Sequence, residues 1–189
     1  MIEMVAQILA QVAAGLLLRF RGSKSTGTFE AVADFALDRF LGVWYLAAYS
    51  PPPFQRKLSD ASTEYRRGED GNISVINRAY DPKKQNWQVE ETAGVFKLDE
   101  HTGWLVVDSS NPLNENRKII YLNPDYTQAI IVGLTMRTLW ITYRDEHLEK
   151  RDLDVLINRA EDLGFKTRML VRVDQSRGDE WRSSAADTA

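Results

Sequence analysis

The chain has 189 residues and contains no cysteine. Disulfide bonds and thiolate catalysis are therefore excluded for this sequence, and we expect no lipid-modified cysteine near the N-terminus. Histidine is almost as scarce. His101 and His147 are the two that occur, and both fall in expected turns without the paired spacing of metal ligands. We therefore expect neither a metal site nor another cofactor.

The chain also lacks an excess of charge of one sign. Its formal net charge is −3, which gives no reason to expect a nucleic-acid partner. It contains neither a glycine-rich phosphate loop nor a basic patch interleaved with aromatic residues. Hydrophobic residues make up 43% of the chain, which is enough for the core of a single domain.

Residues with catalytic potential are also few. Without cysteine the nucleophile would be serine or threonine, and neither histidine has an evident partner. Glu90 and Glu91 are neighbours in an expected strand, where their side chains face opposite sides and do not pair. Asp152 and Asp154 fall on the solvated side of an expected helix. We interpret all four carboxylates as solvated charges, so the sequence predicts no catalytic residues.

What the chain does contain is a series of short apolar and β-branched segments. Segments of this kind, bounded by Gly, Pro, Asn and Asp, indicate strands joined by turns. Their regular spacing suggests a β-sandwich or an up-and-down barrel. The eight segments lie near residues 43–50, 60–66, 73–80, 86–96, 103–108, 117–122, 127–134 and 138–144.

Three motifs that are distant in sequence would meet at one end of such a barrel. Gly42 and Trp44 begin the first strand, Asp125 and Tyr126 lie in the turn between the sixth and seventh, and Arg144 ends the eighth. Successive antiparallel strands alternate in direction, so all three positions fall at the same end. A guanidinium over an indole face contributes about 0.5–2 kcal/mol. The motifs would plug this end and leave the other end open.

Several segments in this order carry a family resemblance. They are residues 40–45 (FLGVWY), 75–82 (VINRAYDP) with Trp87, 139–144 (LWITYR) and 164–165 (GF). Over residues 34–175 the chain resembles the lipocalin family, and within it the bacterial outer-membrane lipocalin and apolipoprotein D group. The resemblance implies an all-β fold, an eight-stranded antiparallel up-and-down barrel that holds a hydrophobic small molecule. The bacterial members of that group are typically lipoproteins, and the missing cysteine departs from their pattern.

Strand alternation predicts which side chains line the barrel. The prediction starts from Trp44 and Arg144, which must point inward to plug the base. The small residues Ala48, Ala129 and Gly133 favour free space inside, although the alternative remains that side chains simply fill the barrel. The predicted ligand-binding residues are Leu46, Ala48, Phe54, Thr63, Tyr65, Val75, Asn77, Leu105, Val107, Ile119, Tyr121, Ala129, Ile131, Trp140 and Thr142.

The expected open end carries a stiff loop and a polar loop. Prolines at 51–53 stiffen the first, so Phe54 is a candidate partial lid. Residues 109–116 are polar, whereas the group that the chain resembles has an aromatic, glycine-rich loop there, so this mouth would not dip into a bilayer. Four basic residues expected near the rim either meet an anionic headgroup or are simply solvated: Arg56, Lys57, Arg117 and Lys118.

The segments outside the barrel are less informative. Residues 1–21 predict an apolar helix that docks on the barrel or on another chain, lies on a membrane surface, or acts as an atypical targeting segment. They lack the positive charge that precedes the apolar run of a signal peptide. Residues 22–33 suggest a linker. A helix near residues 148–163, ended by Gly164, would pack outside the barrel. Residues 176–189, including Trp181, suggest a disordered tail.

These observations predict a protein that binds or transports a small hydrophobic ligand. A fatty acid or a lysophospholipid is plausible, because each buried methylene contributes about 0.8 kcal/mol. The first alternative is a lipocalin-fold enzyme, such as an isomerase of a hydrophobic substrate. The second is an interaction protein recruited to a membrane surface or a homo-oligomer through residues 1–21. Without a clear signal peptide or a cysteine, we expect a cytoplasmic or membrane-associated location.

Overall fold

The computed structural model describes residues 29–50, 59–68, 71–107, 115–133, 138–145, 147–178 and 180–181. The predicted helix over residues 1–21, the candidate lid Phe54, the basic residues Arg56 and Lys57, and most of the polar loop 109–116 lie outside these ranges. None of the described helices is long and apolar enough to cross a membrane.

The described strands form one antiparallel sheet that closes on itself. The sheet runs in the order β2-β3-β4-β5-β6-β7-β8-β1, and β1 also pairs with β2, which completes the barrel. A short ninth strand, β9, adds to β1. The predicted eight-stranded up-and-down barrel is therefore confirmed. The strands are β1 (Gly42–Tyr49), β2 (Ser59–Arg67), β3 (Ile73–Asp81), β4 (Asn86–Phe96), β5 (Trp104–Val107), β6 (Glu115–Leu122), β7 (Gln128–Val132), β8 (Leu139–Tyr143) and β9 (Val171–Arg172).

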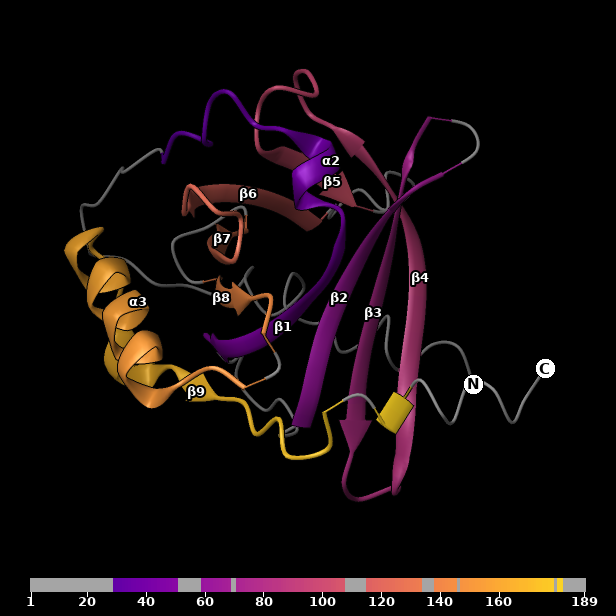
Figure 1. Cartoon of the computed structure of the whole chain (residues 1–189), viewed down its shortest axis with the longest axis vertical. Coiled ribbons are helices and arrows are strands. Elements are labelled where there is room, and N and C mark those ends of the chain that lie inside the picture. Colours follow the sequence, from indigo (N-terminus) through magenta and orange to yellow (C-terminus); the bar gives the residue numbers. More distant parts are fainter. Residues whose placement is uncertain are drawn as a thin grey trace, which may run out of the picture.

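Two helices pack against the barrel, one across an end and one on its outer wall. The short helix α2 (Leu37–Phe40) lies across one end, at the top of Figure 1, and buries Leu37 and Phe40 in the barrel core. The longer helix α3 (Lys150–Asp162) lies outside the barrel, on the left of the view. Its buried residues Leu153, Leu156 and Ala160 pack with residues of β1, β7 and β8. The barrel wall therefore separates an inner core from an outer one.

The end of α3 is set by Gly164. This residue has φ +91°, a conformation that glycine adopts without the steric cost that other residues meet. The Gly164 N–H donates to the carbonyl of Glu161 at 2.8 Å, and the Phe165 N–H donates to that of Ala160 at 3.0 Å. These two bonds form a Schellman motif, and they confirm that the helix ends at Gly164 as expected. Phe165 then stacks on Phe29, with ring centroids 4.8 Å apart.

The pairing of β1 with β8 contains a bulge that reverses the faces of β1. Leu46 pairs with Thr142, but Ala48 pairs with Ile141, which belongs to the outer core beneath α3. The predicted inward position of Ala48 is therefore wrong. Tyr49 pairs instead with Trp140, which packs against the inner core. One extra residue in a strand reverses the alternation beyond it.

A second bulge has the same effect in β6. Its register against β7 shifts between Ile119 and Tyr121, so that Tyr121 pairs with Ile130 of the outer core. The predicted inward position of Tyr121 is wrong as well. Its ring lies outside the barrel, under the guanidinium of Arg159 at 4.2 Å. Leu122 packs against the inner core in its place.

Residues 173–178 and 180–181, which we call the C-terminal strap, seal the barrel wall where β1 and β2 separate. β1 pairs with β2 only as far as Tyr45 and Ser62. Beyond this point the Gln175 amide donates to the carbonyls of Leu46 and Ala61, each at 2.9 Å. The Asp60 N–H donates to the carbonyl of Asp174 at 2.7 Å. The strap thus replaces the missing strand pairing between β1 and β2.

The strap continues over the outer face of β2 and β3. The Arg177 guanidinium lies 4.0 Å from the ring centroid of Tyr80, and Arg78 lies 4.0 Å from that of Trp181. Arg78 is itself buried and pairs with Glu64 at 2.8 Å. The expectation of disorder from residue 176 onward therefore fails for residues 176–178 and 180–181, and the Trp181 ring has a structural partner in Arg78.

Candidate functional site

The base of the barrel is organised around Trp44. Its side chain is fully buried, and its indole N–H donates to the Phe40 carbonyl at 2.8 Å. The rings of Phe40 and Trp44 stack with centroids 4.7 Å apart. The Arg144 guanidinium also lies over the indole, 4.1 Å from its centroid. The indole therefore contacts both a phenyl ring and a cation, and together these groups close this end of the barrel.

Arg144 also binds the backbone of three separate segments. Its guanidinium donates to the carbonyls of Arg39 at 2.9 Å, Phe40 at 2.7 Å, Val43 at 3.1 Å and Tyr126 at 3.3 Å. Burial lowers the pKa of Arg144 to about 10. Because this value is still well above neutral pH, the side chain keeps its charge and its donors there. Arg144 therefore ties α2, the start of β1 and the turn before β7 together.

The turn before β7 contributes one of its two expected residues to the base. Tyr126 has a positive φ of 58°, and its hydroxyl accepts a hydrogen bond from the Ala36 N–H at 2.9 Å. The Arg39 guanidinium lies 4.2 Å from its ring centroid. Asp125 is exposed on the same turn. The structure thus brings Gly42, Trp44, Tyr126 and Arg144 together and leaves Asp125 at the surface.

Gly42 is needed at the base for two reasons. Its φ is +101°, and a Cβ at this position would lie 2.9 Å from Nη1 of Arg144. We expect Gly42→Ala to lower the free energy of unfolding by about 1–3 kcal/mol, because it adds backbone strain and displaces the guanidinium. Urea denaturation of the purified protein would measure this change.

Gly71→Ala is the matched control for this substitution. Gly71 has φ +82° and no heavy atom within 4 Å of the added Cβ, so that variant introduces only the backbone strain. Equal losses of stability in the two variants would show that the contact with Arg144 contributes nothing.

The interior next to this base is apolar. Val75, Leu105, Val107, Ile119, Ala129 and Ile131 form one buried cluster with Phe35, Phe40, Trp44 and Tyr65, and Trp140 packs against it. Register places Leu46, Thr63, Asn77 and Thr142 on the same inner face. All predicted lining residues among the described ones, apart from Ala48 and Tyr121, therefore face the interior, and Phe54 lies outside the described residues. The Thr142 hydroxyl is buried there without a hydrogen-bond partner among the described residues.

A cationic side chain faces this apolar interior. Arg117 pairs with Leu105 across β5 and β6, and only 6% of its surface is exposed. Its two Nη atoms donate to the Tyr65 hydroxyl at 3.1 Å and to Oδ1 of Asn77 at 3.0 Å. The same Oδ1 accepts from the Thr63 hydroxyl at 3.0 Å. Our placement of Arg117 at the rim is therefore wrong, because its side chain lies inside the barrel.

A carboxylate faces the same interior. Glu90 pairs with Asn77 across β3 and β4, which puts its side chain on the inner face. The interpretation of Glu90 as a solvated charge is wrong, whereas Glu91 is exposed as expected. Lys118 faces outward, where its ammonium donates to the Phe29 carbonyl at 3.0 Å and lies 3.8 Å from the Trp104 ring centroid.

The inward position of Arg117 could have been predicted from the alternation of side chains along its strand. Arg117 is two residues before Ile119, and both positions precede the bulge in β6. The argument that placed Ile119 inside therefore also places Arg117 inside. Tyr49 and Leu122, in contrast, face inward only because of the bulges. Burial raises the pKa of the Tyr49 hydroxyl, so this group stays protonated at neutral pH.

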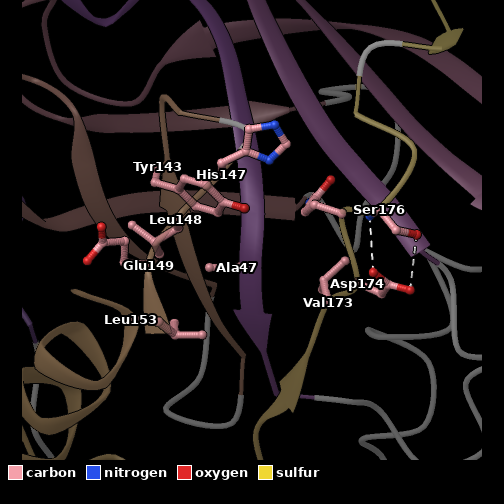
Figure 2. A pocket seen from close by; sticks show the side chains of 10 residues that line it. Ala47, Tyr143, His147, Leu148, Glu149, Leu153, Val173, Asp174 and Ser176 are labelled. Atoms are coloured by element: carbon pink, nitrogen blue, oxygen red, sulfur yellow. Dashed lines mark hydrogen bonds between the residues drawn. The ribbon is translucent and has the colours of Figure 1, made fainter. Parts of the chain in front are cut away.

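A separate hollow of about 460 Å³ lies outside the barrel. It sits between the start of α3, the outer face of β1 and the C-terminal strap (Figure 2). Its wall mixes apolar and polar groups: Ala47, Tyr143, His147, Leu148, Glu149, Leu153, Val173, Asp174, Gln175 and Ser176.

The described residues contain no group of three potential ligands that could hold a metal ion.

Comparison with known sequences agrees with this geometry. The family model of a lipocalin-like domain matches residues 35–175. The outer membrane lipoprotein Blc of Vibrio cholerae is 34% identical over 147 residues, which cover 77% of this chain and 86% of that protein. The protein of the same name from Escherichia coli is 26% identical over 168 residues, which cover 89% of this chain and 95% of that protein.

Comparison with solved structures supports the fold. Insecticyanin from the tobacco hornworm Manduca sexta superposes with a TM-score of 0.63 at 16% identity, over 81% of this chain and 87% of that one. At this identity the likeness concerns the barrel fold alone.

The bacterial relatives also correct one expectation. Both are outer membrane lipoproteins by name, which places those proteins in the cell envelope. The expectation of a cytoplasmic location for this chain is therefore wrong.

Proposed function

Because this chain belongs to the lipocalin-like family, we propose that it binds a small hydrophobic ligand, a lipid such as a fatty acid or a lysophospholipid, inside the barrel. Membership rests on the family match over residues 35–175. The observation that carries the proposal is the interior itself. Apolar side chains from most strands face the barrel interior, and the Trp44 base closes one end of it.

The energetics of such a site favour a long apolar ligand. Each methylene transferred from water contributes about 0.8 kcal/mol, so an acyl chain supplies most of the binding free energy. Ordering the ligand offsets part of this gain. The few polar groups on the inner face, among them Thr142, Asn77 and Arg117, would set its orientation, as polar groups do in other ligand sites.

Native mass spectrometry tests this proposal. The full chain, purified under native conditions from cells that express it, should carry an added mass that matches a lipid. Thr92→Trp should lower the occupied fraction, because Thr92 pairs with Val75 on the inner face and an indole there would fill the interior.

Ala93→Trp is the matched control. Ala93 is the next residue in β4 and is exposed on the outer face, so this variant should keep its lipid. Circular dichroism would establish that both variants are folded. A protein that carries no lipid and takes none up from oleate or lysophosphatidylcholine would contradict the proposal.

We propose a binding role without catalysis. Arg117 beside Tyr65 and Asn77 is the kind of buried ionisable group that an isomerase would also need. The two functions differ in outcome, because a binder returns its ligand unchanged. Chemical conversion of a co-purified lipid, lost in Arg117→Gln, would establish the enzyme instead.

The relatives also suggest where the protein acts. By analogy with the two outer membrane lipoproteins, we place this chain in the cell envelope. Fractionation of cells that express the full chain would test this, and recovery only with the cytosolic fraction would contradict it.

A further inference from the structure

We propose that the C-terminal strap undocks as a unit while the barrel stays folded, and that this opening admits and releases the lipid through the wall between β1 and β2. The route for the ligand rests on the proposed function, whereas the opening of the strap can be measured without a ligand. The inference adds the segment that controls exchange of the lipid.

The strap covers a break in the barrel wall. β1 pairs with β2 only from Gly42 to Tyr45, and the rest of β1 lies toward the end opposite the Trp44 base. The strap crosses the ends of both strands there, at the bottom of Figure 1. Leu46, just beyond the last pair, faces the interior with Thr142, its partner in β8. Undocking of the strap would therefore open the wall beside an inward-facing side chain.

Polar contacts, instead of apolar packing, hold the strap on this seam. None of its described residues belongs to the inner or the outer core. The Gln175 amide bridges the carbonyls of Leu46 and Ala61, and the Trp181 ring lies against the guanidinium of Arg78. Toward α3, residues 173–176 border the hollow of about 460 Å³ (Figure 2). Segments with few buried apolar contacts are those that open at low cost in free energy.

Three buried oxygen atoms at the seam have no hydrogen-bond partner among the described residues. They are Oδ2 of Asp60, Oγ of Ser62 and Oε1 of Gln175. Asp60 and Ser62 are only 2% and 4% exposed. A buried polar atom without a partner opposes the closed state, and undocking would return these atoms to water. The closed strap is therefore less stable than its hydrogen bonds alone would make it.

The bulge in β2 depends on the strap for support. The register of β2 against β3 shifts between Ser59 and Ser62, and Asp60 within the bulge has a positive φ of 52°. A residue other than glycine keeps this conformation where its surroundings hold it. The strap holds Asp60 at two points, because the Asp60 N–H donates to the Asp174 carbonyl and Oδ1 of Asp60 accepts from the Arg177 N–H, each at 2.7 Å. Undocking removes both contacts, so this edge of β2 is released together with the strap.

Amide hydrogen exchange, followed by NMR on the full chain at neutral pH, measures the opening. The N–H groups of Asp60, Val173 and Arg177 are bonded across the contact between strap and barrel. After correction for intrinsic rates, we expect them to exchange at least about a hundredfold faster than the most protected amides of β3, because a local unit opens more easily than the whole fold. Equal rates would mean that the strap opens only when the barrel unfolds, and would overturn the inference.

Gln175→Ala should loosen the strap without loosening the barrel. Loss of its two hydrogen bonds should speed exchange of the same three amides about tenfold, while the amides of β3 keep their rates. Gln128→Ala is the matched control, because Gln128 lies on β7, which β8 and β1 separate from the strap. This variant should leave the exchange of the strap amides unchanged.

Stopped-flow fluorescence with cis-parinarate, a fluorescent fatty acid, connects the opening to the ligand. On the delipidated full chain, Gln175→Ala should raise the association and the dissociation rate constants by the same factor of about ten and leave Kd unchanged, because a gate changes access and not affinity. Gln128→Ala should leave both rate constants as in the wild type.

The outcomes separate the inference from the function on which it rests. Unchanged rate constants in Gln175→Ala despite faster exchange of the strap amides, or a changed Kd, would overturn passage through the seam while lipid binding stands. If the wild type binds neither cis-parinarate nor lysophosphatidylcholine, the proposed function fails and the route falls with it, while hydrogen exchange still decides whether the strap opens separately. Should Gln175→Ala not fold, Trp181→Ala loosens the strap at its contact with Arg78 and should change the exchange and the rate constants in the same direction.

Discussion

Replacing Trp44 by alanine is expected to lower the free energy of unfolding by about 3–5 kcal/mol, the usual cost of removing a large aromatic side chain from a core. Trp44 is fully buried. The substitution removes its stacking on Phe40, its hydrogen bond to the Phe40 carbonyl and its contact with Arg144. It would also leave a void at the closed end of the barrel. The midpoint of urea denaturation, followed by circular dichroism, measures the effect.

Trp87→Ala provides the comparison for this result. Trp87 is half-buried on the outer face of β4, where it contacts Tyr80 with ring centroids 5.7 Å apart. A cross-strand pair of this kind contributes about 0.2–1 kcal/mol. An unchanged midpoint for Trp44→Ala, or one shifted no further than that of Trp87→Ala, would refute the role of the indole as the plug of the barrel.

The second large effect is expected for Arg144→Met. This change removes the donors to the carbonyls of Arg39, Phe40, Val43 and Tyr126 and the cation above Trp44. We expect a loss of about 2–4 kcal/mol, because carbonyls at a partly buried site lose their partners. Arg144→Lys should recover less than half of this loss, since an ammonium lacks the planar fork that serves several acceptors at once. Denaturant unfolding again provides the measurement.

Two further variants make this prediction specific. Arg159→Met removes an exposed guanidinium that lies over Tyr121, and a contact of that kind at the surface contributes only about 0.5–1 kcal/mol. Combining Arg144→Met with Trp44→Ala should cost less than the sum of the single changes, because both remove the same contact. Strict additivity would mean that the two side chains stabilise the base independently.

The strands could be located from sequence because their signals are local. The predicted segments at 73–80 and 86–96 match β3 (Ile73–Asp81) and β4 (Asn86–Phe96) closely. Turn residues and alternation act within a few neighbours along the chain. The base could also be anticipated, because strand direction alone brings Trp44 and Arg144 to the same end.

The lining could be anticipated only up to each bulge. Ala48 and Tyr121 point outward because one residue in β1 and one in β6 leave the regular pairing. A bulge depends on how two strands fit around a curved wall, so the residue pattern of either strand alone does not predict it. Alternation predicted Leu46 and Ile119 correctly on the near side of each bulge and failed beyond it.

The placement of charged residues shows a second limit of prediction from sequence. Glu90 was assigned to solvent and Arg117 to the rim of the barrel because charges usually lie at the surface, although alternation places both inside. The burial of Arg117 is tolerated because β2, β3 and β6 face one interior, where Tyr65 and Asn77 hold the guanidinium. Partners that are 52 and 40 residues away in sequence leave no trace in a local pattern.

Short-range pattern was therefore sufficient for the strands and their turns, and the family resemblance added the closed barrel in which Trp44 meets Arg144. It could not show the reversed faces of Tyr49 and Leu122, the buried Arg117, or the docking of Trp181 on Arg78. The physical reason is the range of the interactions. Hydrophobic alternation and turn preference operate over a few residues, whereas bulges, buried charges and the strap depend on surfaces that exist only once the sheet has closed.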